Sequence, residues 1–300
     1  MNVSKTCIAI CITLFTVAFS FAQQDFQGKA FYQSKTTMDL GNFGGREMSP
    51  ERKKMIMERM KSFLEKSFTL TFNKSESIYK EEEQLATPGK GKGFGGMMGS
   101  FTGGAQYKNV KDNSLLQEQD FFGKQFLIKD SLPKLNWKLT GETKQIGKYL
   151  CMKATAVKPV DQMDWRSMRR KGKKEENKEE EEANKEADTT KKASTNLLEE
   201  IEIPKEIEVT AWYTMQIPVN QGPGEYWGLP GLILEVSADR TTILCSKIVL
   251  NPAEKETIKV PSKGKKVTKK EYNEIVMKKM EEMREMYGGR RGKNGRGGKR

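Results

Sequence analysis

Short runs of alternating apolar and polar residues recur along this chain and constrain its fold most strongly. In the clearest run, residues 208–217, one face carries Val209, Ala211, Tyr213, Met215 and Ile217. A period of two is typical of a β-strand with one buried face. Similar runs fill residues 106–157 and 232–250, separated by short turn segments. About ten such runs predict a mainly β fold, either a single strongly curved antiparallel sheet or a partly open barrel.

A rigid corner is predicted directly before one of these runs. The sequence there is Trp227-Gly228-Leu229-Pro230-Gly231-Leu232-Ile233. Proline fixes its own φ and favours an extended residue before it, whereas glycine tolerates a positive φ. The segment 229–232 therefore fits a type II turn in which Gly231 takes the positive φ. Because turn chemistry accounts for every residue type in the corner, a structural role is favoured over direct ligand contact.

The corner also resembles a known family signature. Gly228, Leu229, Pro230, Gly231, Leu232 and Ile233 match the motif that names the GLPGLI family of secreted Bacteroidetes proteins. Shorter pieces at residues 122–126, 149–154 and 211–218 extend the resemblance. The resemblance implies a secreted β-rich protein and permits a partnership with an outer-membrane transport or receptor protein. That family has no assigned activity, so the resemblance does not identify a substrate.

The first 22 residues are predicted to be a secretory signal peptide. Lys5 precedes an apolar stretch at residues 7–19, and Ser20-Phe21-Ala22 provides small residues for cleavage. The apolar stretch is too short for a stable membrane span. We therefore expect an exported protein that is soluble after cleavage, in the periplasm or outside the cell.

The remainder divides into a β-rich domain, residues 23–262, and a C-terminal region, residues 263–300. Within the domain, residues 86–104 are rich in glycine and predict a flexible loop. Residues 166–200 are almost wholly charged or small, so we expect a disordered insertion between two strands of the same sheet.

Two helices are predicted at the edges of this β pattern. The first starts at Ser49, a suitable N-cap, with Pro50 at the first helical position. The second starts at Thr268, where Glu271 completes a capping box, and it is followed by a basic tail rich in glycine and arginine.

Two cysteines remain after the signal peptide is removed, Cys151 and Cys245. Strand parity places each opposite the apolar side chains of its own strand, on a less buried face. Disulfides persist in exported proteins, so a bond between the two is possible. Two unpaired, half-buried thiols are the alternative.

Histidine is absent from the chain, and this removes most enzyme templates. Serine and cysteine nucleophiles activated by histidine, and histidine-based zinc sites, are excluded. Residues 91–96 match a GxGxxG pattern, but no apolar strand precedes them and no helix follows. We therefore expect a protein without catalytic residues, cofactor or cytoplasmic nucleic-acid partner.

Three binding functions remain open. The first is a binding or accessory module that holds an apolar or extended ligand in the curved sheet, for which Trp212, Tyr226 and Trp227 are candidate contacts, although core or edge packing of these aromatics is the alternative. The second is Cu(I) or Ag(I) handling by the methionines of the C-terminal helix, a weak alternative to simple packing. These methionines are Met277, Met280, Met283 and Met286. The third is adhesion to anionic envelope polymers, suggested by the net charge of +13 and the basic C-terminus.

Overall fold

The computed structural model describes residues 26–38, 49–82, 104–160, 169–170, 201–202 and 204–288. The predicted signal peptide and the basic tail after residue 288 lie outside the described residues. So do the glycine-rich loop, apart from Gly104, and the charged insertion, apart from residues 169–170.

Twelve strands form one open sheet in the described part of the chain. They are β1 (Gln27–Thr36), β2 (Glu65–Asn73), β3 (Glu76–Glu81), β4 (Gln106–Asn109), β5 (Ser114–Phe121), β6 (Lys124–Ser131), β7 (Lys138–Ile146), β8 (Tyr149–Pro159), β11 (Glu206–Thr214), β12 (Leu232–Ala238), β13 (Thr241–Leu250) and β14 (Lys265–Val267). Their order across the sheet is β14-β6-β5-β4-β3-β2-β1-β13-β12-β11-β8-β7. A separate short pair consists of β9 (Arg169–Arg170) and β10 (Ile201–Glu202).

The mainly β, antiparallel prediction is confirmed, and the sheet does not close into a barrel. Neighbouring strands of the large sheet are antiparallel with one exception, β14, which runs parallel to β6. The parallel pairing arises because β14 arrives through the long connection from β13 rather than through a hairpin. It covers three residue pairs, from Lys265–Phe126 to Val267–Ile128.

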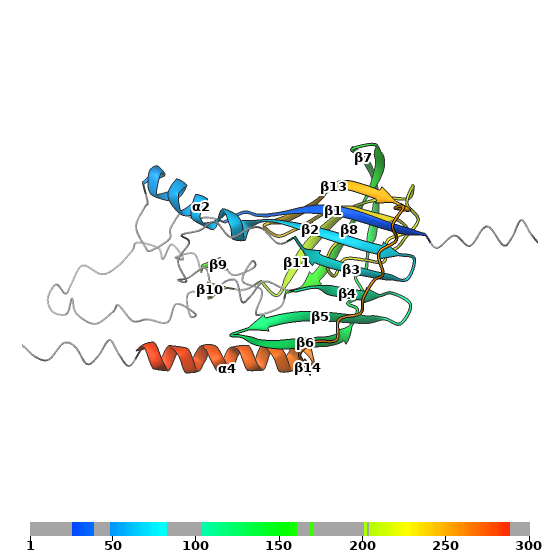
Figure 1. Cartoon of the computed structure of the whole chain (residues 1–300). Coiled ribbons are helices and arrows are strands. Elements are labelled where there is room, and N and C mark those ends of the chain that lie inside the picture. Colours follow the sequence, from blue (N-terminus) through cyan, green and yellow to red (C-terminus); the bar gives the residue numbers. More distant parts are fainter. Residues whose placement is uncertain are drawn as a thin grey trace, which may run out of the picture.

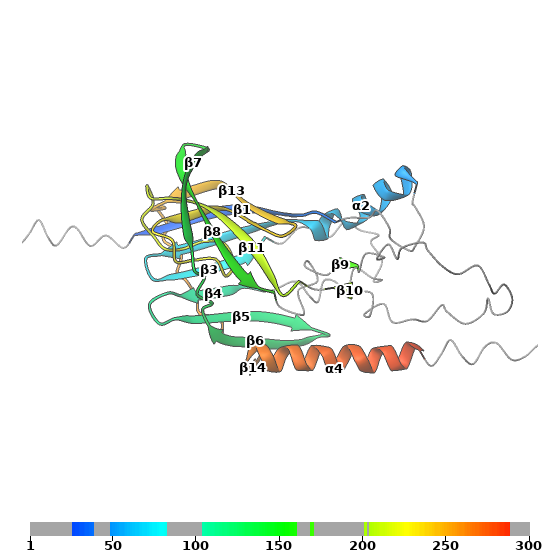
Figure 2. The same ribbon diagram turned by 180° about the vertical axis from the view of Figure 1, so that it is seen from behind.

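The sheet is strongly curved. In Figures 1 and 2 the strands β1 to β6 lie one below another, while β8 and β11 cross them at a steep angle. Two register irregularities, at Phe31/Tyr32 in β1 and Trp212/Tyr213 in β11, contribute to this bend. The ladder between β12 and β13 covers only residues 235–238 and 241–244. Beyond this ladder the two strands separate: β12 continues to pair with β11, and β13 continues to pair with β1.

The connection from β11 to β12, residues 215–231, fills the concave side of the sheet. Ile217 and Val219 pack with residues of β1 and β2, such as Tyr32 and Leu70. Leu229 packs in a second cluster on β8, β11 and β12. From the sequence, the concave side could have been either an open cavity or a filled core. The connection at residues 215–231 packs there as part of the core.

Both helices begin as predicted. In α2 (Pro50–Leu64) the Ser49 hydroxyl accepts a hydrogen bond from the Arg52 N–H at 3.4 Å. In α4 (Lys269–Gly288) the Thr268 N–H donates to the Glu271 carboxylate at 2.7 Å, and the Glu271 N–H donates to Thr268 Oγ1 at 3.2 Å. These bonds with Thr268 lower the pKa of Glu271, which is consistent with a formed capping box.

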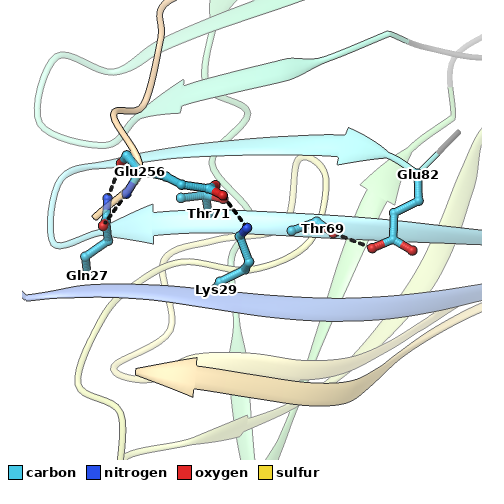
Figure 3. Close-up of polar contacts among 6 residues, drawn as sticks. All are labelled: Gln27, Lys29, Thr69, Thr71, Glu82 and Glu256. Carbon is cyan, nitrogen blue, oxygen red and sulfur yellow. Dashed lines mark hydrogen bonds and ion pairs between the residues drawn. The ribbon is translucent and has the colours of Figure 1, made fainter. Parts of the chain in front are cut away.

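The connection from β13 to β14 is fastened on the outer face of the sheet (Figure 3). Its residue Glu256 exchanges two hydrogen bonds with the Gln27 side chain, one through each backbone group. The Glu256 carboxylate pairs with Lys29 and accepts a 3.4 Å hydrogen bond from Thr71. These contacts guide the chain back to the β6 edge, where Val267 and Val276 pack against Phe126.

Candidate functional site

The corner is built differently from the predicted type II turn. Gly231 does not have a positive φ; the nearby glycines that do are Gly224 and Gly228, at +55° and +92°. A Cβ added to Gly231 would lie 2.1 Å from the Thr214 carbonyl oxygen, so glycine is required by close backbone approach. The prediction for Gly231 was wrong because this approach comes from the end of β11, outside the local sequence.

The rest of the corner packs into the core. Leu229, Leu232 and Ile233 are buried, whereas Pro230 is exposed. The Leu232 N–H donates to the Ile217 carbonyl and the Ile233 N–H donates to the Gln221 carbonyl, each at 3.0 Å. These two bonds hold the first half of the connection from β11 to β12 against the start of β12.

The three aromatic candidates do not form one surface. Tyr226 is buried in the cluster that includes Tyr213, whereas Trp212 packs against the cluster that includes Tyr32. The Trp212 ring is half-buried, with the Lys144 ammonium 4.3 Å from its centroid. The three side chains therefore lie in separate packing environments.

Trp227 takes part in two hydrogen bonds with the segment that precedes β7. Its indole N–H donates to the Pro133 carbonyl, and the Trp137 indole N–H donates to the Trp227 carbonyl, both at 2.8 Å. These two bonds hold the connection against the segment that leads into β7. The polar edge of the Trp227 ring is therefore already satisfied within the chain.

The two cysteines lie in the core, so their predicted exposure was wrong. Cys151 is fully buried whereas its neighbour Leu150 is 58% exposed. Both thiols are free and pack in the cluster of Tyr32 and Leu232, where β12 and β13 have separated. The face that parity marked as apolar is the exposed one at these positions, since Leu150 is 58% and Leu244 is 41% exposed. Desolvation raises the pKa of Cys151 to about 11 and that of Cys245 to about 12.

We expect both thiols to be unreactive in the folded protein. Burial hinders access, and the raised pKa values leave little thiolate at pH 8. Iodoacetamide at pH 8, with peptide mass spectrometry, should label Cys151 and Cys245 only after addition of denaturant. Failure of labelling in denaturant, with recovery after reduction, would show instead that a disulfide joins them.

The structure brings together a buried polar cluster that the sequence did not predict. Ser77 and Lys108 are cross-strand neighbours in β3 and β4, and both have 0% exposure, as does Gln221. The Lys108 ammonium donates to the carbonyls of Gly222 and Tyr226 at 2.7 and 3.1 Å. The Ser77 hydroxyl donates to Gln221 Oε1 at 2.8 Å. The cluster therefore fixes the turn at residues 222–226 on the sheet.

Burial governs the chemistry of Lys108. Desolvation lowers its pKa to about 7, although the negative charge of Glu225 opposes this shift. Glu225 is itself paired with Lys158 on β8. The sequence offered little signal for this site, since a lysine in the short run 106–109, beside the polar turn 111–113, is typical of an exposed strand end.

A row of glutamines continues from Lys108 on the same face. Gln106 shares the parity of Lys108 on β4, and its cross-strand partner is Gln117 on β5. Gln119 follows two positions later, and the Gln117 amide donates to its Oε1 at 3.4 Å. Gln106 and Gln117 are half-buried and Gln119 is buried. The row lies beside the turn, because a Cβ added to Gly224 would be 3.7 Å from Gln106 Oε1.

The methionines of α4 are mostly away from the core. Met277, Met280 and Met286 are exposed, and Met283 is half-buried. The helix contacts the sheet through Val276 and Tyr272 instead. No helix in the described ranges is long and apolar enough to cross a membrane.

Comparisons with known proteins find a distant structural similarity. No curated protein matches the chain. Among solved structures, PNGF-II in a C2 crystal form is similar, with 13% identity and a TM-score of 0.44 over 84% of this chain and 33% of that chain. The same protein in a P21 form gives 13% identity and a TM-score of 0.43, over 84% and 33%. The chain thus spans about a third of the length of the PNGF-II chains it matches.

The family similarity is confined to the part of the sheet that contains the corner. Residues 137–235 match the model of the Porph_ging family, which is described as a protein of unknown function. That stretch contains β7, β8, β11, the connection and the beginning of β12. The segment similar to this family is therefore the one whose connection fills the concave face and is fixed there by Lys108.

Proposed function

We propose that the protein is an exported cell-envelope binding protein of the GLPGLI type, which recognises an extended oligosaccharide and has no catalytic role. The observation that carries this proposal is the row of Gln106, Gln117 and Gln119 beside the turn at residues 222–226. A carboxamide both donates and accepts hydrogen bonds, as a sugar hydroxyl does. Side chains on adjacent strands lie about 4.8 Å apart, so the row offers repeated polar contacts to an extended chain.

A rigid backbone supports this row. Lys108 and Ser77 fasten the neighbouring turn through buried hydrogen bonds, so little ordering is required when a ligand binds. An apolar ligand inside the curved sheet is less well suited, because residues 215–231 already fill that space. The proposal therefore keeps the extended ligand expected from the sequence and replaces its apolar character with a polar one.

The location and partner remain part of the proposal. The predicted signal peptide and the resemblance to the GLPGLI signature support export. They also support a role beside an outer-membrane transport or receptor protein, in which this chain would present the oligosaccharide.

The amide row is tested by a double substitution. Gln106→Ala/Gln117→Ala should weaken oligosaccharide binding at least about fivefold, since each lost neutral hydrogen bond is worth roughly 0.5–1.5 kcal/mol. A glycan array would first identify an oligosaccharide that binds the wild type, and calorimetry would then compare the variants. The matched control is Gln33→Ala/Gln125→Ala, which removes two exposed glutamines from the opposite face. Equal weakening by both pairs, or no glycan bound by the wild type, would refute the proposal.

A further inference from the structure

Helix α2 has the composition of a helix that lies on a charged surface. Its fifteen residues include five Lys or Arg and two Glu, a net charge of +3. Apolar side chains recur at Ile56, Met60 and Phe63, which are spaced by four and three residues and so share one face. The helix is therefore both basic and amphipathic.

The basic residues flank the apolar face on both sides. With 100° between successive residues, Arg52 and Arg59 lie on one border of the stripe and Lys53 lies on the other. This arrangement allows the long basic side chains to keep their charged ends in water while the apolar face enters an interface between water and an apolar phase.

The sheet leaves this helix largely uncovered. None of the three core clusters among the described residues includes an α2 side chain, and Leu64, in the last turn, is its one buried residue. The stripe residues Ile56, Met60 and Phe63 are half-buried, and Met55 and Met57 on either side of them are 46% and 38% exposed. Figures 1 and 2 show α2 leaving the ends of β1 and β2 and pointing away from the sheet.

Helix α4 provides a contrast within the same chain. It carries five Lys or Arg and five Glu, so its charges balance, and it packs on the sheet through Val276. Exposed methionines are thus present on both helices, but an excess of positive charge around an apolar stripe outside the core clusters is present on α2.

We propose that α2 is a membrane-surface helix that binds the anionic face of a lipid bilayer. Its apolar face would enter the headgroup boundary, and its flanking cations would pair with lipid phosphates. Charge complementarity selects an anionic lipid over a neutral one. The helix would hold the sheet beside the membrane independently of any ligand bound at the glutamine row.

Vesicle co-sedimentation of the full mature chain tests this proposal. We expect binding to vesicles of equal phosphatidylglycerol and phosphatidylethanolamine, and little binding to pure phosphatidylcholine. Replacing the three flanking cations, Arg52→Gln/Lys53→Gln/Arg59→Gln, should lower partitioning on the order of 100-fold, since each contributes about fivefold. Ile56→Asp/Met60→Asp should abolish binding, whereas Met277→Asp/Met280→Asp on α4 should leave it unchanged.

Circular dichroism melts would show that each variant is folded. The triple charge variant keeps the apolar stripe, so it tests the helix even if Ile56→Asp/Met60→Asp unfolds. The proposal is overturned if the wild type ignores anionic vesicles or binds phosphatidylcholine equally well. It is also overturned if the charge variant binds like the wild type, because binding would then originate elsewhere, for example in the tail after residue 288.

Discussion

Gly231→Ala is expected to reduce the free energy of unfolding by about 3 kcal/mol or more, although alanine is the smallest possible change. The new methyl group would lie 2.1 Å from the Thr214 carbonyl oxygen and 2.6 Å from its carbonyl carbon. Both atoms belong to the backbone, so no rotamer change relieves the clash. Overpacking of this kind costs about 1–3 kcal/mol or more, and here it would also separate β11 from β12. Urea unfolding followed by tryptophan fluorescence would measure the loss.

Gly141→Ala is the matched control for this substitution. Gly141 has a φ of +76°, but no atom lies within 4 Å of an added Cβ. Its replacement should therefore cost only the left-handed backbone penalty, roughly 1–2 kcal/mol. If Gly231→Ala were no more damaging than Gly141→Ala, the close approach of Thr214 would not explain why glycine stands in the corner.

Features determined by neighbouring residues could be predicted from the sequence. The alternation in residues 208–217 placed Val209, Ala211 and Tyr213 on one face, and all three are buried. Met215 was placed on the same face but is 56% exposed, because β11 ends at Thr214. The capping pair Thr268 and Glu271 is formed, because both partners lie within one turn of the helix. Such signals are local, so they do not depend on how the strands are arranged.

Features determined by distant residues could not be predicted in the same way. Gly231 is constrained by Thr214, seventeen positions earlier, and Cys151 is buried in a cluster with residues of distant strands, such as Tyr32. Lys108 is held by a carbonyl 114 positions away. The candidate site depends on this last contact, which explains why aromatic residues near the corner were predicted as contacts and the amide row was not.

Lys108→Met is expected to remove a rise in stability between pH 7 and pH 9. Burial lowers the pKa of Lys108 to about 7 in the folded protein, whereas an unfolded lysine titrates near 10.5. Between these values the unfolded chain binds one more proton than the folded chain, so the free energy of unfolding increases with pH. The gain contributed by Lys108 approaches about 1.4 kcal/mol per pH unit above its folded pKa, or about 2 kcal/mol from pH 7 to pH 9, because the folded lysine is already half deprotonated at pH 7.

The difference between variants isolates this contribution from that of other groups. Tyr107, Tyr272 and the two thiols also titrate at alkaline pH, but they are present in both proteins. Urea unfolding at pH 7, 8 and 9 should therefore show the wild type gaining about 2 kcal/mol relative to Lys108→Met. Lys129→Met, which removes an exposed lysine from β6, should retain the slope of the wild type. Parallel pH profiles for the wild type and Lys108→Met would mean that the pKa of Lys108 is not lowered in the folded protein. The Lys108 amine would then not be buried beneath the turn at residues 222–226.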